Sequence, residues 1–138
     1  MEQTLVIIKP DAVSRGQIGE VLSRFEGEGL KVRALKMVLM DKGEAQSFYS
    51  VHRERPFFES LCRFMSSGPA VVAVLEGKEA VARVRQLMGA TNPLEAKDGT
   101  IRRELGTSIE QNVVHGSDSI ESASVEIPFF FNQLEIFP

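Results

Sequence analysis

The sequence is poor in cysteine and in long hydrophobic runs. Its 138 residues contain one cysteine, Cys62, and no tryptophan. A single cysteine excludes an internal disulfide and a metal site built from several cysteines. Cys62 stands among apolar residues in "FFESLCRFM", so we interpret it as buried filler and not as a nucleophile. No stretch approaches the roughly 18 consecutive apolar residues of a membrane-spanning helix, so we expect no membrane span.

The amino-terminal segment lacks the features of a secretory signal. "MEQTLVIIKPD" has an acidic second residue, no basic n-region and no small-residue cleavage site. We therefore expect this segment to be the first strand of a domain. Together with the scarcity of cysteine, it predicts a cytoplasmic protein in a reducing compartment.

The signatures of the common phosphate-binding enzymes are also missing. The chain has no G-x-x-x-x-G-K-[ST] loop, no G-x-G-x-x-G after a strand, and neither H-R-D nor D-F-G. These absences exclude the Walker-type and protein-kinase ways of holding a nucleotide. The absence of G-x-S-x-G excludes a hydrolase nucleophile elbow at Ser117. His52 and His115 are the only histidines and have no partner at metal-ligand spacing, so we expect no histidine-based metal site.

The charge balance argues against a nucleic-acid binder. The formal net charge is −3, and an acidic protein repels the phosphate backbone of nucleic acids. Basic residues nevertheless recur along the chain, at Lys9, Arg55, Arg85, Arg102 and Arg103. If several of these cations converge in the fold, they suit a small anionic ligand better than a polymer.

Apolar patterns predict alternating strands and helices. Short apolar runs predict strands in "TLVIIKP" (4–10, stopped by Pro10), "LKVRALKMVLM" (30–40), "AVVAVLE" (70–76) and "NVVH" (112–115). Helical spacing or capping predicts helices after Gly16 and over 42–52, 56–65, 78–89 and 118–131. We expect Asp41 to cap the second helix, Pro56 to lie in the first turn of the third, and Asp118 or Ser119 to cap the last.

Two parts of the chain depart from this regular pattern. The stretch 91–111 has little apolar periodicity, which is typical of a functional or irregular loop. Pro128 falls inside the last predicted helix, which should kink or end there.

The order of elements predicts a β-α-β-β-α-β unit, an antiparallel sheet with helices on one face. At this length we expect a single domain over residues 1–138. Such a fold hosts many functions, so the function has to come from the site.

The segment "NVVHGSDS" (112–119) places His115 at a strand end, directly before a glycine. Loops at strand ends often carry functional residues, and a histidine there can be a base, an acid or a nucleophile. Gly116 would let backbone and substrate approach closely. Ser117 or a carboxylate such as Glu126 could orient the ring or its loop.

A histidine that attacked phosphorus would need cations and donors around the phosphoryl oxygens. Four candidates lie at the edges of predicted elements or in the irregular stretch, namely Lys9, Arg85, Thr91 and Arg102.

Six blocks of sequence carry a resemblance to a known family. "IIKPDAV", "FYSVHRERPFF", "SGP", "LMGATNP", "GTIR" and "NVVHGSDS" occur in this order between Thr4 and about Phe131. Together they resemble the nucleoside diphosphate kinase family, in a bacterial-type form that lacks a longer tail after "EIFP". The resemblance implies an α/β (α+β) fold, a ferredoxin-like βαββαβ sandwich whose four-stranded antiparallel sheet is covered by helices. It also implies ping-pong transfer of the γ-phosphate of a nucleoside triphosphate, mainly ATP, to a nucleoside diphosphate through a phosphohistidine.

The same resemblance implies roles for individual residues. His115 would be the nucleophile, phosphorylated on its pros nitrogen, with Tyr49 nearby and Ser117 and Glu126 as buttresses. Phosphates, sugar and base would be held by Lys9, Arg85, Thr91, Arg102, Asn112, Gly116, Phe57 and Leu61. Within this set Phe57 would stack on the base, Leu61 would line the same slot, and Asn112 and Lys9 would contact the sugar. Arg103 directly follows Arg102, and we favour Arg102 as the phosphate contact.

The resemblance further implies Mg²⁺, carried by the nucleotide phosphates with no ligand from the protein. Its expected partners are nucleoside di- and triphosphates and copies of the same chain, as a tetramer in preference to a hexamer or dimer. We expect no membrane and no obligate nucleic-acid partner. Two alternatives remain open at this point: a non-catalytic nucleotide-sensing module and a nucleic-acid binder.

Overall fold

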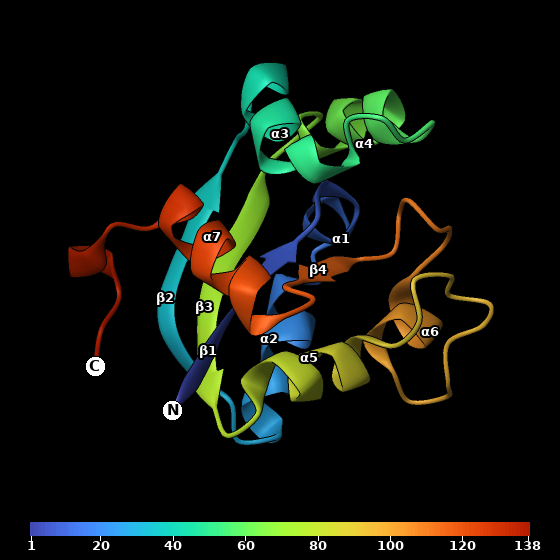
Figure 1. The fold of residues 1–138 in the computed structure, drawn as a ribbon. Coiled ribbons are helices and arrows are strands. Elements are labelled where there is room, and N and C mark those ends of the chain that lie inside the picture. The colour runs from blue at the N-terminus through green and yellow to red at the C-terminus, as the bar shows by residue number, and fades with distance from the viewer.

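A four-stranded antiparallel sheet forms the centre of the molecule (Figure 1). The computed structural model describes residues 1–138. The strands are β1 (Glu2–Ile8), β2 (Lys31–Val38), β3 (Ala70–Gly77) and β4 (Val114–Gly116), in the spatial order β2-β3-β1-β4. Every neighbouring pair is antiparallel. This topology confirms the predicted ferredoxin-like βαββαβ sandwich.

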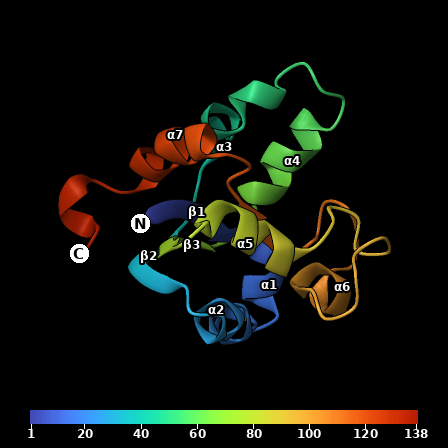
Figure 2. The same cartoon turned by 60° about the horizontal axis from the view of Figure 1, so that its bottom comes forward.

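Helices cover both faces of this sheet, so the expectation of helices on one face was wrong. Val6 and Ile8 belong to one buried cluster, whereas Leu5 and Ile7 belong to a second one, and all four are fully buried. Successive side chains of a strand point to opposite faces, so β1 is covered on both sides. Figure 2 shows α3, α4 and α7 on one side of the strands and α2 on the other.

The first face is covered by α2 (Ile18–Gly27) and α5 (Ala80–Met88). Both helices were predicted, and each is followed by a glycine at positive φ, Gly29 and Gly89, where a left-handed backbone ends the helix. A short helix that we did not predict, α1 (Pro10–Ser14), directly follows β1.

The second face carries α3 (Lys42–Phe48), α4 (Phe58–Met65) and α7 (Ile120–Phe130). Asp41 caps α3 as predicted, through a capping box with Glu44. The helix α4 begins at Phe58, after a 3₁₀ turn at Ser50–His52, so Pro56 lies ahead of the helix and not in its first turn.

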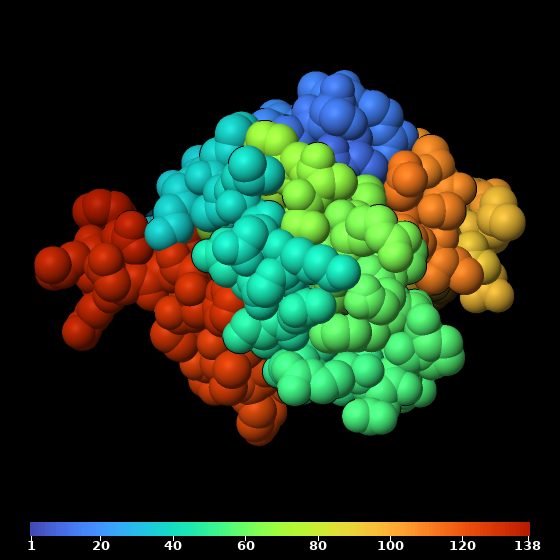
Figure 3. Space-filling model, turned by 90° about the horizontal axis from the view of Figure 1, so that it is seen from above, coloured from blue at the N-terminus to red at the C-terminus, as the bar shows by residue number.

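The final helix keeps Pro128 inside it and ends at Phe130. Its cap is Ser119, whose hydroxyl accepts a hydrogen bond from the Ser122 amide; Asp118, the other candidate, accepts a hydrogen bond from the Ser122 hydroxyl. A further 3₁₀ turn, η2 (Gln133–Glu135), follows. Figure 3 shows this C-terminal end protruding from one side of the molecule, with the α3–α4 region covering the middle of the view.

The stretch 91–111 is less irregular than its sequence indicates, because it contains a five-residue helix, α6 (Ile101–Leu105). Thr100 caps this helix by accepting a hydrogen bond from the Arg103 amide. Cys62 is a free cysteine and is buried, as the sequence predicted. None of the helices is long and apolar enough to cross a bilayer.

Candidate active site

A cavity of about 850 Å³ lies beside β4. The helices α3 to α7, the 3₁₀ turn Ser50–His52, the strand β4 and the loops beside β1 and β4 line it. All of the site residues that the sequence suggested lie on its walls except Ser117: Lys9, Tyr49, Phe57, Leu61, Arg85, Thr91, Arg102, Asn112, His115, Gly116 and Glu126. The fold thus brings together segments that are more than 100 residues apart in the chain.

His115 occupies the middle of β4, opposite Ile7 of β1. Its Nε2 lies 2.9 Å from Oε1 of Glu126, which α7 carries to the cavity. No hydrogen bond reaches the other ring nitrogen, Nδ1. If Nε2 carries the proton and donates it to the carboxylate, Nδ1 keeps a free lone pair.

Ser117 lies behind this pair and holds the carboxylate. Its fully buried hydroxyl donates a hydrogen bond to Glu126 Oε1 at 2.8 Å and accepts one from the Leu5 amide at 3.3 Å. Glu126 Oε1 therefore receives two hydrogen bonds and is tied to the central strand. The proline two residues later in α7 does not prevent Glu126 from reaching the histidine.

An aromatic wall of Phe48 and Tyr49 flanks the histidine ring. The Phe48 and His115 ring centroids are 5.5 Å apart and those of Tyr49 and His115 are 6.1 Å apart, both edge to face. Burial, reinforced by the charge of Glu126, raises the pKa of Tyr49. The phenol therefore stays neutral, and its buried hydroxyl has no hydrogen-bond partner within the chain.

Lys9 and Asn112 form a buried polar pair beside the histidine. The Lys9 ammonium donates to Asn112 Oδ1 at 2.8 Å, and Asn112 Nδ2 donates to the Thr91 carbonyl at 3.0 Å. Burial, together with the positive charge of Arg102, lowers the pKa of Lys9 to about 8. An anion bound in the cavity would oppose this effect and favour the charged ammonium.

Two arginines add positive charge to the same region. Arg102 is almost fully buried, and its guanidinium donates to the Val114 carbonyl at 2.7 Å and to the Gly89 carbonyl at 3.0 Å. Burial and the nearby Arg85 lower its pKa to about 10, so it remains a cation at neutral pH. Arg103 instead pairs with Asp98 at 3.4 Å and is absent from the cavity wall, in keeping with our preference for Arg102.

The opposite part of the cavity is apolar and open. Phe57 and Leu61, from the start of α4, line it together with Ile109, and the Phe57 side chain is half exposed. A hydrogen bond of 2.7 Å from the Ser60 hydroxyl to the Glu110 carboxylate joins α4 to the loop that carries Ile109. These side chains give this part of the cavity an apolar lining that suits an aromatic group.

Gly116 lines the cavity, but its tightest neighbours belong to α5. A Cβ at this position would lie 2.9 Å from Met88 Sδ and 3.0 Å from Val84 Cγ1. The glycine therefore allows β4 to pack closely against α5, a packing reason that we did not anticipate.

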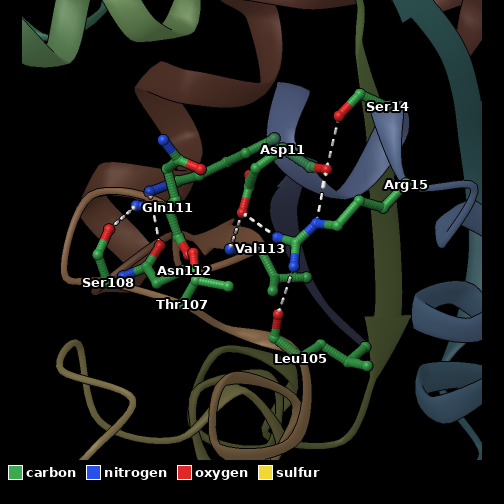
Figure 4. A network of polar contacts seen from close by, with 10 residues as sticks. Asp11, Ser14, Arg15, Leu105, Thr107, Ser108, Gln111, Asn112 and Val113 are labelled. Carbon is green, nitrogen blue, oxygen red and sulfur yellow. Dashed lines mark hydrogen bonds and ion pairs between the residues drawn. The ribbon is translucent and has the colours of Figure 1, made fainter.

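The backbone just before β4 is strained. Val113 has φ +83°, a conformation that a β-branched residue rarely adopts and that costs about 1–3 kcal/mol. Figure 4 shows the Val113 amide donating to the carboxylate of Asp11, which also pairs with Arg15. Strain of this kind often marks a functional site.

Comparison with known protein families matches residues 2–136 to the model described as nucleoside diphosphate kinase. The chain belongs to the nucleoside diphosphate kinase family. A nucleoside diphosphate kinase from Desulfosudis oleivorans is 62% identical over 136 residues, which cover 99% of this chain and 98% of the relative. One from Campylobacter jejuni subsp. doylei is 59% identical over 137 residues, covering 99% and 100% of the two chains.

Solved structures of family members share the fold. The nucleoside diphosphate kinase of Aquifex aeolicus superposes with a TM-score of 0.96 at 51% identity, over 98% of each chain. A nucleoside diphosphate kinase family protein from Babesia bovis gives a TM-score of 0.95 at 40% identity, over 100% of this chain and 93% of the other. The resemblance that the six sequence blocks carry is thereby confirmed.

Sequence reasoning missed several residues of this nucleoside diphosphate kinase cavity. Phe48 contacts the histidine ring, but its apolar side chain next to Tyr49 looked like ordinary core. Ile109 is an isolated apolar residue in a polar stretch, and its exposure of 59% is visible only in the fold. Outside the cavity wall, sequence reasoning also missed the contact between Asp11 and Val113, which are 102 positions apart, because no local pattern indicates it.

Proposed function

We propose that this chain moves the γ-phosphate of a nucleoside triphosphate, mainly ATP, to a nucleoside diphosphate through a phosphohistidine on His115. The observation that carries the proposal is the imidazole fixed in a cavity with three cations, with Nε2 2.9 Å from Glu126 and Nδ1 free. Family membership supports the same reaction.

In the first half-reaction, His115 Nδ1 forms a bond to the γ-phosphorus while the bond from that phosphorus to the bridging oxygen breaks. The nucleoside diphosphate leaves with the electron pair of the broken bond. Positive charge develops on the imidazole, and Glu126 stabilises it through Nε2–H. The second half-reaction reverses these steps with a different nucleoside diphosphate as the acceptor.

Lys9, Arg85 and Arg102 hold the phosphates in this mechanism. Their charges offset the negative charge on the phosphoryl oxygens as the bond to phosphorus changes. Thr91 contributes at the same end, where its carbonyl anchors Asn112. Asn112 and Lys9 contact the sugar, and the neutral Tyr49 offers a hydroxyl donor near the histidine.

Phe57 and Leu61 receive the base. Stacking on an aromatic face does not read hydrogen-bonding edges, because every base has a π-face. The site should therefore accept different bases, with phosphate and sugar contacts supplying most of the affinity.

The metal of the reaction is Mg²⁺, bound to the nucleotide phosphates. Mg²⁺ keeps several of its waters and binds mainly through substrate phosphates, so the nucleotide and not the protein would supply its ligands. Such a cation, when bound, supplies further neutralisation of the phosphate charge.

The chain acts as one domain, in the cytoplasm and as a homo-oligomer, with a tetramer favoured over a dimer or hexamer. Exposed apolar side chains on the edge strand β2 support self-association: Leu35 is 51% and Met37 57% exposed. Burying them against another copy would remove apolar area from water.

A pulse and chase tests the reaction directly. Protein incubated with Mg²⁺ and ATP labelled on the γ-phosphate should gain acid-labile, base-stable label, and unlabelled GDP should discharge it as labelled GTP. The His115→Ala variant should gain none. Bound nucleotide without label on the wild-type protein would instead favour the nucleotide-sensing module.

A further inference from the structure

Val113 is held in its strained conformation by contacts to a single short segment. Its amide donates to Asp11 Oδ2 at 3.2 Å, and its carbonyl accepts a hydrogen bond from the Lys9 amide at 2.8 Å. Both polar groups of this residue thus bind the turn where β1 passes into α1. Val113 is fully buried, so water cannot replace either contact.

The Asp11 carboxylate is buried and positioned to accept the hydrogen bond from the Val113 amide. It is 6% exposed, and its Oδ2 receives both the Val113 amide and, at 3.0 Å, a guanidinium nitrogen of Arg15. Its other oxygen has no partner in the chain. Arg15 in turn donates to the Leu105 carbonyl at the end of α6, as Figure 4 shows.

The strained residue stands between two groups of the site. Asn112, which precedes it, accepts from the Lys9 ammonium at 2.8 Å, and His115 follows two positions later. A rotation of Val113 to negative φ would turn the Asn112 side chain away from Lys9 and shift the strand that carries His115. The alignment of these groups therefore depends on whatever stabilises φ +83° at Val113.

We propose that Asp11 is a positioning residue for phosphotransfer: its carboxylate holds the strained Val113 backbone, and that backbone aligns Asn112 and His115. The inference rests on the proposed function. Asp11 touches neither the histidine nor the cavity; against the larger effect of burial, its charge raises the pKa of Lys9, and its hydrogen bond to Val113 is its direct link to the main chain of the site. Its bond to Arg15 is a separate contact within α1 and its C-cap; it is Arg15 that donates to the Leu105 carbonyl at the end of α6.

Four variants separate the two contacts. Asp11→Asn keeps an oxygen that can accept the Val113 amide but loses the charge that pairs with Arg15. Arg15→Gln removes the ion pair and leaves the carboxylate on Val113. Asp11→Ala removes both, and Asp11→Leu, which fills the same space without an acceptor, replaces it if the alanine variant does not fold. The rate of His115 phosphorylation in a single turnover, the KM for the diphosphate and the melting temperature are measured for each.

Asp11→Ala should slow phosphorylation by roughly 10- to 100-fold, because a displacement of about 1 Å at reacting groups costs up to about 100-fold. It should also raise the KM through Asn112. Asp11→Asn and Arg15→Gln should keep the rate within about threefold of wild type, although both should melt at lower temperature. Losses that follow melting temperature equally in all variants, or a normal rate in Asp11→Ala or Asp11→Leu, would overturn the proposal. Failure of the wild-type protein to form phosphohistidine would instead overturn the proposed function.

Discussion

Replacing Glu126 with glutamine removes the negative charge that faces His115 and keeps the side chain at nearly the same size. The amide oxygen of glutamine can still accept a hydrogen bond from Ser117 or from the histidine ring. The change therefore isolates the charge of the carboxylate, which in our account stabilises the imidazole as Nδ1 attacks phosphorus.

The structure sets the size of the expected effect. His115 and Glu126 are 2.9 Å apart with side-chain exposures of 20% and 19%, so solvent screens the pair only in part. A hydrogen bond to a charged group contributes about 1.5–3 kcal/mol, against about 0.5–1.5 kcal/mol for a neutral one. The difference of roughly 1–2 kcal/mol predicts phosphorylation slower by about 5- to 30-fold, since about 1.4 kcal/mol corresponds to a factor of ten.

The assay is a rapid-quench single turnover with enzyme in excess over Mg²⁺-ATP. Glu121→Gln is the matched control, because Glu121 lies on the same helix and lines the same cavity without a hydrogen bond to His115. The control should phosphorylate at close to the wild-type rate. A Glu126→Gln rate within twofold of wild type would refute the argument that the carboxylate stabilises the reacting ring.

Three further predictions follow from other parts of the structure. The pKa of Lys9 is lowered from 10.5 to about 8, so the folded protein binds fewer protons than the unfolded chain between these pH values. Urea titrations at pH 7.5 and 10.5 should therefore show the free energy of unfolding of the wild type rising with pH by on the order of 3 kcal/mol relative to that of Lys9→Met. Equal pH dependence in both proteins would contradict this prediction. Ser60→Ala breaks the 2.7 Å hydrogen bond to Glu110 and should raise the KM for nucleoside diphosphates about two- to fivefold with kcat unchanged. The control is Lys42→Ala, which breaks the exposed ion pair between Lys42 and Glu59, the neighbour of Ser60 in α4; it should leave the KM unaltered. Gly116→Ala places a Cβ 2.9 Å from Met88 Sδ and should lower the free energy of unfolding by about 1–3 kcal/mol, seen as a lower urea midpoint; an unchanged midpoint would show that α5 yields freely.

Long periodic elements could be predicted from the sequence, and short ones could not. The helix α2 repeats its apolar residues over several turns, and that pattern identified it. The five-residue helices α1 and α6 are too short to show such a pattern. Pro10 looked only like the end of a strand, but proline also suits the first position of a helix, and in the structure it begins α1.

The sequence of β1 also indicates that both faces of the sheet are buried. Leu5 to Ile8 form a continuous apolar run, where a strand with one exposed face would alternate apolar and polar residues. We placed helices on one face because the order of elements does not say which side each helix takes.

Some features of the candidate site could be predicted from the sequence and others could not. His115, Lys9 and Arg102 stand in short motifs beside strands or caps, so their chemistry was visible in the sequence. The hydrogen bond from the Val113 amide to Asp11 joins segments that are distant in the chain, and it depends on the positive φ of Val113. Neither feature leaves a local pattern in the sequence.

The position of the phosphate on the histidine distinguishes attack by Nδ1 of His115 from attack by Nε2 or by another residue. Protein phosphorylated with Mg²⁺-ATP would be digested in base and its phosphohistidine compared with authentic pros and tele isomers. Because Nε2 is bound to Glu126 at 2.9 Å, we expect the pros isomer, phosphorylated on Nδ1 of His115. The tele isomer, or phosphate on any other residue, would contradict it.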